Sequence, residues 1–327
     1  MRDSPNDKII VKVISVNNMN YLLRQSPKRE GIYDNIQFVF DDRKECDYVI
    51  VKNRLIEQHD VICDPKNIWA VMMEPAIDGF FDFTLFGHDQ YAKVFRSGKY
   101  SASTKYVKSH IMTYWYLYKD YDTVIDHAIG EKAKLISCVA STKSFLPGHK
   151  KRLSFVKHLI EAELGIDFYG RGRNPIDDKW DALYPYKFSI AIENSSLPDY
   201  WTEKISDCFM AYTIPIYYGC TNIDEYFPAG SFLKIDINDI QGSIQKIKEA
   251  ISGDYYEKNF SALMEARNLY LTKYHFFPCI ANLIKEDQQA RKNESSHPAL
   301  ASLLPYKQSL LRKMYNIAKS QLRKISN

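Results

Sequence analysis

The chain has 327 residues, of which 45% are hydrophobic and 26% are charged, values typical of a globular protein with a full core. Its length is sufficient for two domains. The formal net charge is +4, but residues 301–327 hold six basic and no acidic residues, so the preceding 300 residues carry 4 − 6 = −2. A body this close to neutral gives no electrostatic reason to expect nucleic-acid binding, and we predict none.

Cysteine usage and the start of the chain bear on the compartment. The six cysteines are scattered singly, without a CxxC pair or a histidine at ligand spacing, which argues against a disulfide framework or a zinc site and favours a reducing compartment. The opening residues, MRDSPNDKIIVKVISV, contain no apolar stretch long enough for a signal peptide or a membrane anchor. We therefore expect a cytoplasmic protein. No GxGxxG or Walker pattern is present, so neither dinucleotide binding nor NTP hydrolysis is predicted.

The first half reads as a Rossmann-like domain of short strands and polar loops. Strands are predicted over 8–16, 35–40, 48–51 and 68–73, and a further one over 81–86. Glu74 follows the strand at 68–73, and strand-end carboxylates lie where chemistry takes place in open α/β sheets. From the residues alone, a solvated carboxylate at a strand end is the simpler interpretation.

Residues 91–121 are rich in tyrosine, lysine and serine, with an aromatic centre at 114–118. These rings could line a groove for a sugar, although ordinary core beneath a loop is the simpler interpretation. The charged and poorly periodic segment 120–134 predicts a domain boundary.

A second α/β domain is predicted to begin with a strand at 135–139. A loop at 141–149 follows, and then a helix with an apolar face that includes Leu153, Val156 and Leu159. Arg152 lies in the first turn of this helix. A guanidinium at a loop–helix junction suits bidentate phosphate binding, whereas an arginine on the outer face of a helix is usually just solvated. A short strand at 167–170 precedes two further arginines, at 171 and 173, which could contact phosphate or form a solvated turn.

Residues 186–219 form the most informative stretch, predicted as a strand, a polar loop, a helix and a second strand. The strands are predicted over 187–192 and 214–218, and Thr202 is predicted to cap the helix between them. In such units ligands lie outside the carboxyl ends of the strands. The polar side chains there are Asn194, Tyr200, Glu203 and Lys204. The competing interpretation of Glu203 and Lys204 is the start of an ordinary surface helix.

The same stretch resembles the signature of glycosyltransferase family 10, the α-1,3/4-fucosyltransferases. Glu-Asn-Ser at 193–195, Tyr-Trp-Thr-Glu-Lys-Ile at 200–205 and Ile-Pro-Ile-Tyr-Tyr-Gly at 214–219 occur in the order and spacing of that family. The resemblance is strong over 135–280, weaker over 68–88 and absent over 1–60. Animal members carry an N-terminal membrane anchor, so the chain looks like a bacterial type.

The resemblance implies a GT-B fold, in which two Rossmann-like α/β domains face a cleft. We predict an N-terminal acceptor-binding domain at 1–130 and a C-terminal GDP-sugar-binding domain at 131–285. Residues 286–327 are predicted to be a linker followed by a basic amphipathic C-terminal helix.

The resemblance also implies roles for individual residues. Arg152, Phe155 and Leu159 match a family Arg-x-x-Phe-x-x-x-Leu motif, and the segments 68–74 and 81–85 match a family pair of strands. Glu74 is then the general base that deprotonates the acceptor hydroxyl, and Arg152 and Lys204 hold the donor diphosphate and stabilise the charge on the departing GDP.

Three further residues, Asn194, Tyr200 and Glu203, are implied to seat the nucleotide and the sugar. Because the sequence has no Asp-x-Asp at a strand end, we predict a metal-independent reaction with no cofactor.

The predicted function is an inverting transfer of L-fucose from GDP-fucose to a glycan hydroxyl, with an α-1,3/4-type linkage to N-acetylglucosamine or a similar sugar, in cell-surface polysaccharide or lipopolysaccharide synthesis. Two alternatives stay open. The first is a related transferase that uses another nucleotide sugar, and the second is a glycan-binding protein that has lost turnover.

Residues 301–327 alternate apolar and basic positions, a pattern typical of a helix on an anionic membrane surface. A solvated or self-packing terminal helix would show the same pattern. We expect peripheral association with the inner face of the cytoplasmic membrane, with acceptors that include lipid-linked glycans.

Overall fold

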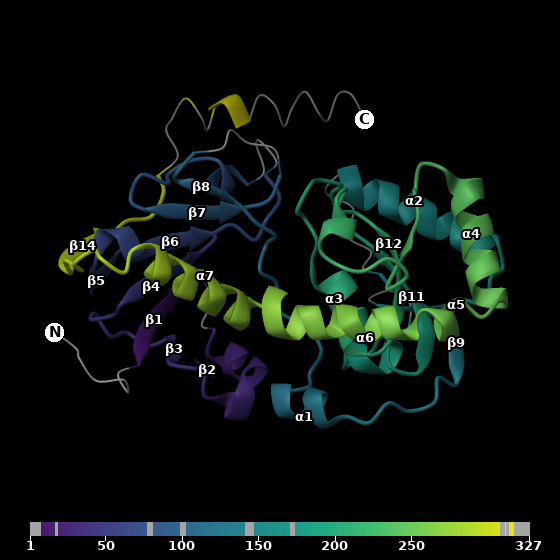
Figure 1. The fold of residues 1–327 in the computed structure, drawn as a ribbon. Helices are drawn as coiled ribbons and strands as arrows, with labels where there is room; N and C mark the ends of the chain where they lie inside the picture. Colours follow the sequence, from purple (N-terminus) through teal and green to yellow (C-terminus); the bar gives the residue numbers. More distant parts are fainter. Residues whose placement is uncertain are drawn as a thin grey trace. The chain divides into compact units, whose positions relative to one another are not determined.

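The structure is a computed structural model that describes residues 8–16, 19–76, 81–98, 103–140, 147–170, 174–307, 311 and 314–316. The chain divides into two compact units, each with its own parallel or mostly parallel sheet (Figure 1). Unit 1 comprises Met1–Leu23, Glu30–Met112 and Leu283–Asn327, and unit 2 comprises Arg24–Arg29 and Thr113–Asn282.

Unit 1 contains a seven-stranded sheet in the order β2-β3-β1-β4-β6-β7-β8. All neighbours in it are parallel except β2 and β3. The strands are β1 (Ile9–Ile14), β2 (Ile32–Tyr33), β3 (Ile36–Val39), β4 (Tyr48–Lys52), β6 (Ile68–Val71), β7 (Lys93–Arg96) and β8 (Tyr106–Lys108).

The central strands of this sheet are apolar along their whole length because both faces of a parallel sheet are covered. Every residue of β4 and of β6 is buried. Lys52, the last residue of β4, is the polar exception, and its burial lowers the pKa of the ammonium group to about 7. The strands predicted at 8–16, 35–40, 48–51 and 68–73 are therefore confirmed as β1, β3, β4 and β6.

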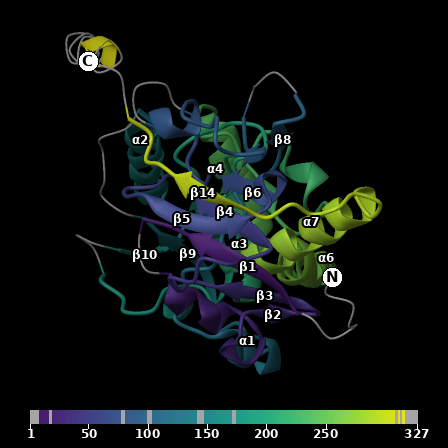
Figure 2. The ribbon, with the colours of Figure 1, turned by 90° about the vertical axis from the view of Figure 1, so that its left-hand side faces the viewer.

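A second, two-stranded sheet in unit 1 pairs β5 (His59–Cys63) with β14 (Ala299–Leu303) in antiparallel register, as Figure 2 shows. Helix α7 (Phe276–Ala290) brings Asp287 into this unit. Asp287 accepts hydrogen bonds from the Tyr48 hydroxyl (2.9 Å) and the Lys93 ammonium (2.6 Å). The end of α7 is thereby joined to β4 and β7.

Unit 2 has a five-stranded, fully parallel sheet in the order β10-β9-β11-β12-β13. The chain passes from β9 to β10 on one side and then to β11 on the other, so a topological switch point lies between β9 and β11. The strands are β9 (Lys134–Val139), β10 (Asp167–Tyr169), β11 (Tyr186–Ile192), β12 (Ile214–Tyr218) and β13 (Leu233–Lys234).

The helices of unit 2 enclose a core that is rich in aromatic rings. Trp201, Phe209, Tyr217 and Phe227 are all buried within it, and Trp201 and Phe209 both pack edge-on against Phe227. The helices are α1 (Tyr121–Asp126), α2 (Pro147–Glu161), α3 (Glu203–Met210), α4 (Ile240–Ser252), α5 (Tyr255–Lys258), α6 (Phe260–Leu269) and a π-helical turn (Tyr270–Tyr274).

Three sequence predictions about elements are wrong. The strand predicted at 81–86 is a 3-10 helix (Asp82–Thr84), because the Thr84 hydroxyl donates to the Phe81 carbonyl at 2.7 Å and closes the turn. Toward the end of the second domain the sequence predicts helices over roughly 239–251 and 254–273. The second of these is interrupted at Asn259, whose side-chain amide donates to the Tyr255 carbonyl at 2.8 Å. The linker predicted from 286 instead contains the end of α7 and the start of β14.

The compact units have different bounds from the predicted domains. The main division falls between 112 and 113 rather than at 130, and the chain from 283 onward belongs to unit 1. The acceptor and donor roles of the two domains stay predictions. The amphipathic helix predicted over 301–327 is wrong for its first residues: 301–303 belong to β14, and 304–307 have no regular structure. Leu311 and residues 314–316 are helical, and the remainder of 308–327 lies outside the described residues.

Residues 24–29 belong to unit 2 because Gln25 is buried there. Its side-chain amide donates to the Trp115 carbonyl (2.7 Å), and its carbonyl oxygen accepts from the Trp115 amide (3.2 Å) and from Nε2 of His275 (3.0 Å). Gln25 thus pairs with the backbone of Trp115 as a strand residue would. Its contact with His275 requires that the imidazole carry a proton on Nε2.

His275 should make stability depend on pH. Burial lowers the pKa of His275 from 6.5 to about 3, so the stability it contributes is complete above pH 6.5 and is lost as the pH falls from there toward 3. Within that window the free energy of unfolding should decrease by up to about 1.4 kcal/mol per pH unit from this group.

Urea unfolding at pH 7, 6 and 5 measures this slope. The variant His275→Gln should flatten it, whereas His158→Gln, at a half-buried position on α2, should leave it unchanged. An equal slope in the wild type and His275→Gln would contradict the assignment.

Candidate functional site

The candidate site lies in unit 2, at the carboxyl ends of β9, β11 and β12. These three strands are neighbours in the sheet, and the loops that follow them lead into α2, into α3 and toward β13. The loop after β11 spans residues 193–202. This is the edge beside the switch point, where ligands bind in open α/β sheets.

Glu193 is the structural centre of the loop after β11. Its carboxylate is 0% exposed, and it accepts hydrogen bonds from the Thr202 amide (2.7 Å), the Thr202 hydroxyl (2.9 Å) and the Lys204 ammonium (2.9 Å). Glu193 was not among the predicted site residues, although it is the first residue of the Glu-Asn-Ser motif at 193–195. The available signal was its place directly after a buried strand, with Thr202, Glu203 and Lys204 a short distance further along the chain.

Two glycines allow the backbone to approach this loop closely. A Cβ on Gly219 would lie 2.3 Å from Cγ of Glu193, and a Cβ on Gly148 would lie 1.7 Å from the carbonyl oxygen of Asn194. Neither distance is compatible with a side chain. The end of β12 and the first turn of α2 therefore both abut the segment 193–194, which fixes the loop between them.

Helix α3 places Glu203 and Lys204 in its first turn. Thr202 is the N-cap residue, as predicted, and its hydroxyl accepts from the Lys204 amide at 3.3 Å. Burial opposes the charge on Lys204, but the carboxylates of Glu193 and Glu203 outweigh it and raise the pKa of the ammonium group. Lys204 is therefore held as a cation at neutral pH, with one-fifth of its side chain exposed.

Glu203 remains ionised for the reciprocal reason. Burial tends to raise its pKa, but Lys204 and Lys179 outweigh burial and lower it. Its carboxylate lies 3.8 Å from the Lys204 ammonium. The predicted pair Glu203 and Lys204 is thus brought together in the structure.

Arg152 and Asn194 form a second predicted pair that the structure brings together. The guanidinium Nη1 donates to Oδ1 of Asn194 at 2.6 Å. Arg152 is buried in the first turns of α2, and burial lowers the pKa of its guanidinium while Glu193 acts against that effect. An arginine keeps its charge under these conditions, so the site has two positive charges, one from α2 and one from α3.

A further ion pair holds α3 at Asp207, one turn beyond Glu203. Asp207 is fully buried and accepts from the Lys179 ammonium (2.7 Å) and from the Tyr116 amide (3.0 Å). Burial raises the pKa of Asp207 to about 6, whereas Lys179 acts to lower it. This contact ties the aromatic segment 114–118 to α3. In that segment Trp115 is buried in the core, whereas the Tyr116 and Tyr118 rings are exposed.

The remaining predicted residues lie as follows. Tyr200 is buried in the loop before α3. Arg171 and Arg173 lie outside the described residues. Glu74 belongs to unit 1, where it follows β6 and is half-buried. Within unit 2 the structure therefore brings together Arg152, Asn194, Glu203 and Lys204 around Glu193. Glu74 belongs to unit 1.

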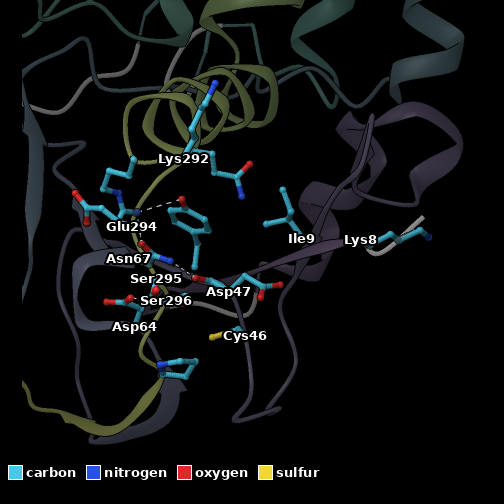
Figure 3. A pocket seen from close by; sticks show the side chains of 14 residues that line it. Lys8, Ile9, Cys46, Asp47, Asp64, Asn67, Lys292, Glu294, Ser295 and Ser296 are labelled. Atoms are coloured by element: carbon cyan, nitrogen blue, oxygen red, sulfur yellow. Dashed lines mark hydrogen bonds between the residues drawn. The ribbon is translucent and has the colours of Figure 1, made fainter. Parts of the chain in front are cut away.

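A cavity of about 400 Å³ lies in unit 1, at the amino ends of β1, β4 and β6 (Figure 3). At its wall the Arg291 guanidinium donates to Asn67 (2.5 Å) and to Asp287 (3.0 Å), and Asn67 donates to the Asp47 carbonyl (2.8 Å). These side chains hydrogen-bond with one another. The cavity lies at the edge of the sheet opposite Glu74, and no predicted site residue lines it.

Two properties of the part of the chain that the structure describes bear on metal binding and on membrane insertion. Within it, no group of three or more His, Cys, Asp or Glu side chains could hold a metal ion. No described helix is long and apolar enough to cross a membrane. The metal-independent reaction stays a prediction.

Comparison with known proteins decides what the segment around this site is. Residues 129–287 match the sequence model of glycosyltransferase family 10 (fucosyltransferase), C-terminal domain. This segment is a family 10 domain. The resemblance read from residues 186–219 is therefore confirmed.

Curated relatives agree with the family 10 domain. The chain is 38% identical over 102 residues to a fucosyltransferase-like protein of Arabidopsis thaliana. The aligned residues make up 30% of this chain and 20% of the relative. It is 34% identical over 82 residues to a human 4-galactosyl-N-acetylglucosaminide 3-alpha-L-fucosyltransferase. The aligned residues make up 24% of this chain and 23% of that enzyme. The chain therefore spans about a fifth of the length of these relatives.

Among solved structures, an alpha1,3-fucosyltransferase with GDP superimposes with a TM-score of 0.51. The match covers 84% of this chain and 94% of the other at 16% identity, so it concerns the fold alone. Together with the two parallel sheets, it confirms the predicted α/β fold class, GT-B with two Rossmann-like units.

Replacing the buried Glu193 should destabilise unit 2. In Glu193→Gln the Lys204 ammonium loses its closest anion, and breaking a buried pair by removing one partner costs about 3 kcal/mol. Urea unfolding should show a loss of that order. The control Glu257→Gln removes the anion of a surface pair with Lys187 and should cost less than about 1 kcal/mol. Equal stabilities of the two variants would show that the Glu193 carboxylate is not needed as an anion.

Proposed function

We propose that the protein is an inverting fucosyltransferase that moves L-fucose from GDP-fucose to a hydroxyl of a glycan. The acceptor sugar would be N-acetylglucosamine or a similar unit, linked through α-1,3 or α-1,4. The observation that carries this proposal is the pair of cations at the switch point of the family 10 domain: Arg152 is held by the half-buried Asn194, and Lys204 by the buried Glu193.

The reaction needs stabilisation of the negative charge that grows on GDP as the bond between fucose C1 and the phosphate oxygen breaks. Arg152 and Lys204 supply positive charge from two helices, and both are fixed before the donor arrives by Asn194 and Glu193. Preorganised charge of this kind is the largest contribution in many enzymes. Asn194, Tyr200 and Glu203 would seat the nucleotide and sugar, and neither metal nor cofactor is required in this proposal.

Inversion requires the acceptor oxygen to attack C1 on the face opposite GDP. Glu74 would accept the proton of the acceptor hydroxyl while the new bond forms and GDP leaves. Its position three residues beyond the end of β6, at the carboxyl edge of the unit 1 sheet, supports this role.

The donor is tested by calorimetric titration with GDP-fucose, GDP-mannose and UDP-sugars. We expect GDP-fucose to bind best, and Arg152→Ala or Lys204→Ala to weaken its binding about 10- to 100-fold, the loss expected for a charge-assisted contact. Lys151→Ala, an exposed neighbour of Arg152 on α2, is the matched control and should bind normally.

Preferential binding of a UDP-sugar would favour the related transferase that uses another nucleotide sugar. Glycan binding without transfer from any donor would favour the protein that has lost turnover.

We further propose that the protein works peripherally at the inner face of the cytoplasmic membrane, on cell-surface polysaccharide or lipopolysaccharide acceptors that include lipid-linked glycans. The basic and apolar composition of residues 301–327 supports this placement.

Truncation after Lys307 tests the membrane proposal while keeping β14 intact. It removes five of the six basic residues of the tail. Binding to vesicles with anionic lipid should be lost, because each basic residue near such a surface contributes about 1 kcal/mol, and transfer to soluble acceptors should persist. Unchanged sedimentation with anionic vesicles would rule out the tail as the membrane contact.

A further inference from the structure

Asn53 of unit 1 holds the backbone that leads to Glu74. Its amide donates to the Val71 carbonyl at 2.9 Å, and its side-chain oxygen accepts from the Met73 amide at 2.7 Å. The side chain therefore continues the β4–β6 pairing beyond the last strand residue, as a neighbouring backbone would. Glu74 is the next residue along the chain.

The opposite side of the same segment is held by β7. The Met72 amide donates to the Phe95 carbonyl at 2.9 Å. Since successive residues of an extended chain bond to alternate neighbours, Asn53 and Phe95 together fix residues 71–73 from both sides. The direction in which the chain enters Glu74 is consequently set by backbone hydrogen bonds, one of which depends on a single side chain.

The conformation of Asn53 is unusual. Its φ is +61°, in the left-handed region, and it stands at the centre of a tight turn that the Arg54 amide closes on the Lys52 carbonyl at 2.8 Å. Asparagine tolerates this region better than most residues, at some cost in conformational energy. Left-handed non-glycine residues persist where the surrounding structure demands them, and they cluster at functional sites.

We propose that Asn53 is a positioning residue for Glu74, holding the strand end so that the carboxylate meets the acceptor hydroxyl. This inference rests on the proposed role of Glu74 as the base. The position of the base matters because displacing a reacting group by about 1 Å can lower the reaction rate about 100-fold. Asn53 acts through the backbone of Met73 and need not contact either substrate.

Three substitutions separate the two properties of Asn53. Asn53→Gly keeps the left-handed turn without strain but removes the acceptor oxygen, and Asn53→Asp keeps both the turn and an acceptor. Asp34→Gly is the matched control, because Asp34 is another left-handed residue of unit 1 (φ +54°), in the turn between β2 and β3.

Initial rates with GDP-fucose and a soluble glycan acceptor should show kcat reduced about 10- to 100-fold in Asn53→Gly. Asn53→Asp should stay within about threefold of the wild type, as should Asp34→Gly. GDP binding, measured by calorimetry, should be unchanged in all three variants, because the proposed donor site lies in unit 2, and urea unfolding should show that unit 1 is still folded. A normal kcat in Asn53→Gly would overturn the inference.

The decisive measurement is a double-mutant cycle with Glu74→Gln. If Asn53 acts through Glu74, then adding Asn53→Gly to Glu74→Gln causes no further loss of kcat. Losses that multiply in the double variant would mean that Asn53 has only a general structural role.

The cycle also separates this inference from the proposed function. If Glu74→Gln is inactive and Asn53→Gly has a normal kcat, the proposed function stands and the inference about Asn53 is wrong. If Glu74→Gln is fully active, or if the wild type transfers no fucose, then both the proposed role of Glu74 and the inference about Asn53 are wrong.

Discussion

The donor-side architecture depends on one buried carboxylate, that of Glu193. Glu193 directly follows β11. Its carboxylate accepts hydrogen bonds from the amide and the hydroxyl of Thr202, the N-cap residue of α3, and forms an ion pair with the Lys204 ammonium group in the first turn of that helix. A carboxylate without exposure is stable only with such partners. Strand, helix cap and cation are therefore interdependent: if one is displaced, the other two lose a partner.

This dependence explains why the cations are fixed before any ligand binds. Lys204 is oriented by Glu193, and Arg152 is oriented by Asn194, the next residue in the chain. The backbones of Gly148 and Gly219 also pack closely against residues 193 and 194. A site built in this way needs little rearrangement when charge develops on a leaving group, which is the condition for effective electrostatic catalysis.

Much of the fold could be predicted from the sequence because buried parallel strands have a strong signal. Runs such as IIVKVI at 9–14 and IPIYY at 214–218 are short and, apart from Lys12, carry no charge, and each is a strand. The strand β7 was missed because its four residues, KVFR, begin and end with charges that are partly or wholly buried. The segment 81–86 has the composition of a strand, yet side-chain hydrogen bonds of the kind made by Thr84 decide locally in favour of a turn.

The same contrast holds for the site. Lys204 and Arg152 could be found because motif spacing places them at helix starts beside strand ends. Glu193 and Asn53 could not be assigned roles in this way, because their hydrogen-bond partners come close only in the folded chain. Glu193 accepts from Thr202 and Lys204. Asn53 bonds to the backbone of Val71 and Met73.

The interleaving of the two units has a consequence for biosynthesis. Residues 24–29 leave the ribosome early, but Gln25 has no Trp115 or His275 to bond until much of unit 2 has been made. Unit 1 likewise waits for Asp287 and for β14, near the other end of the chain. Domains commonly fold in the order in which they are synthesised. Here the unit that begins first is completed last, so its early strands must remain soluble during translation without their final partners.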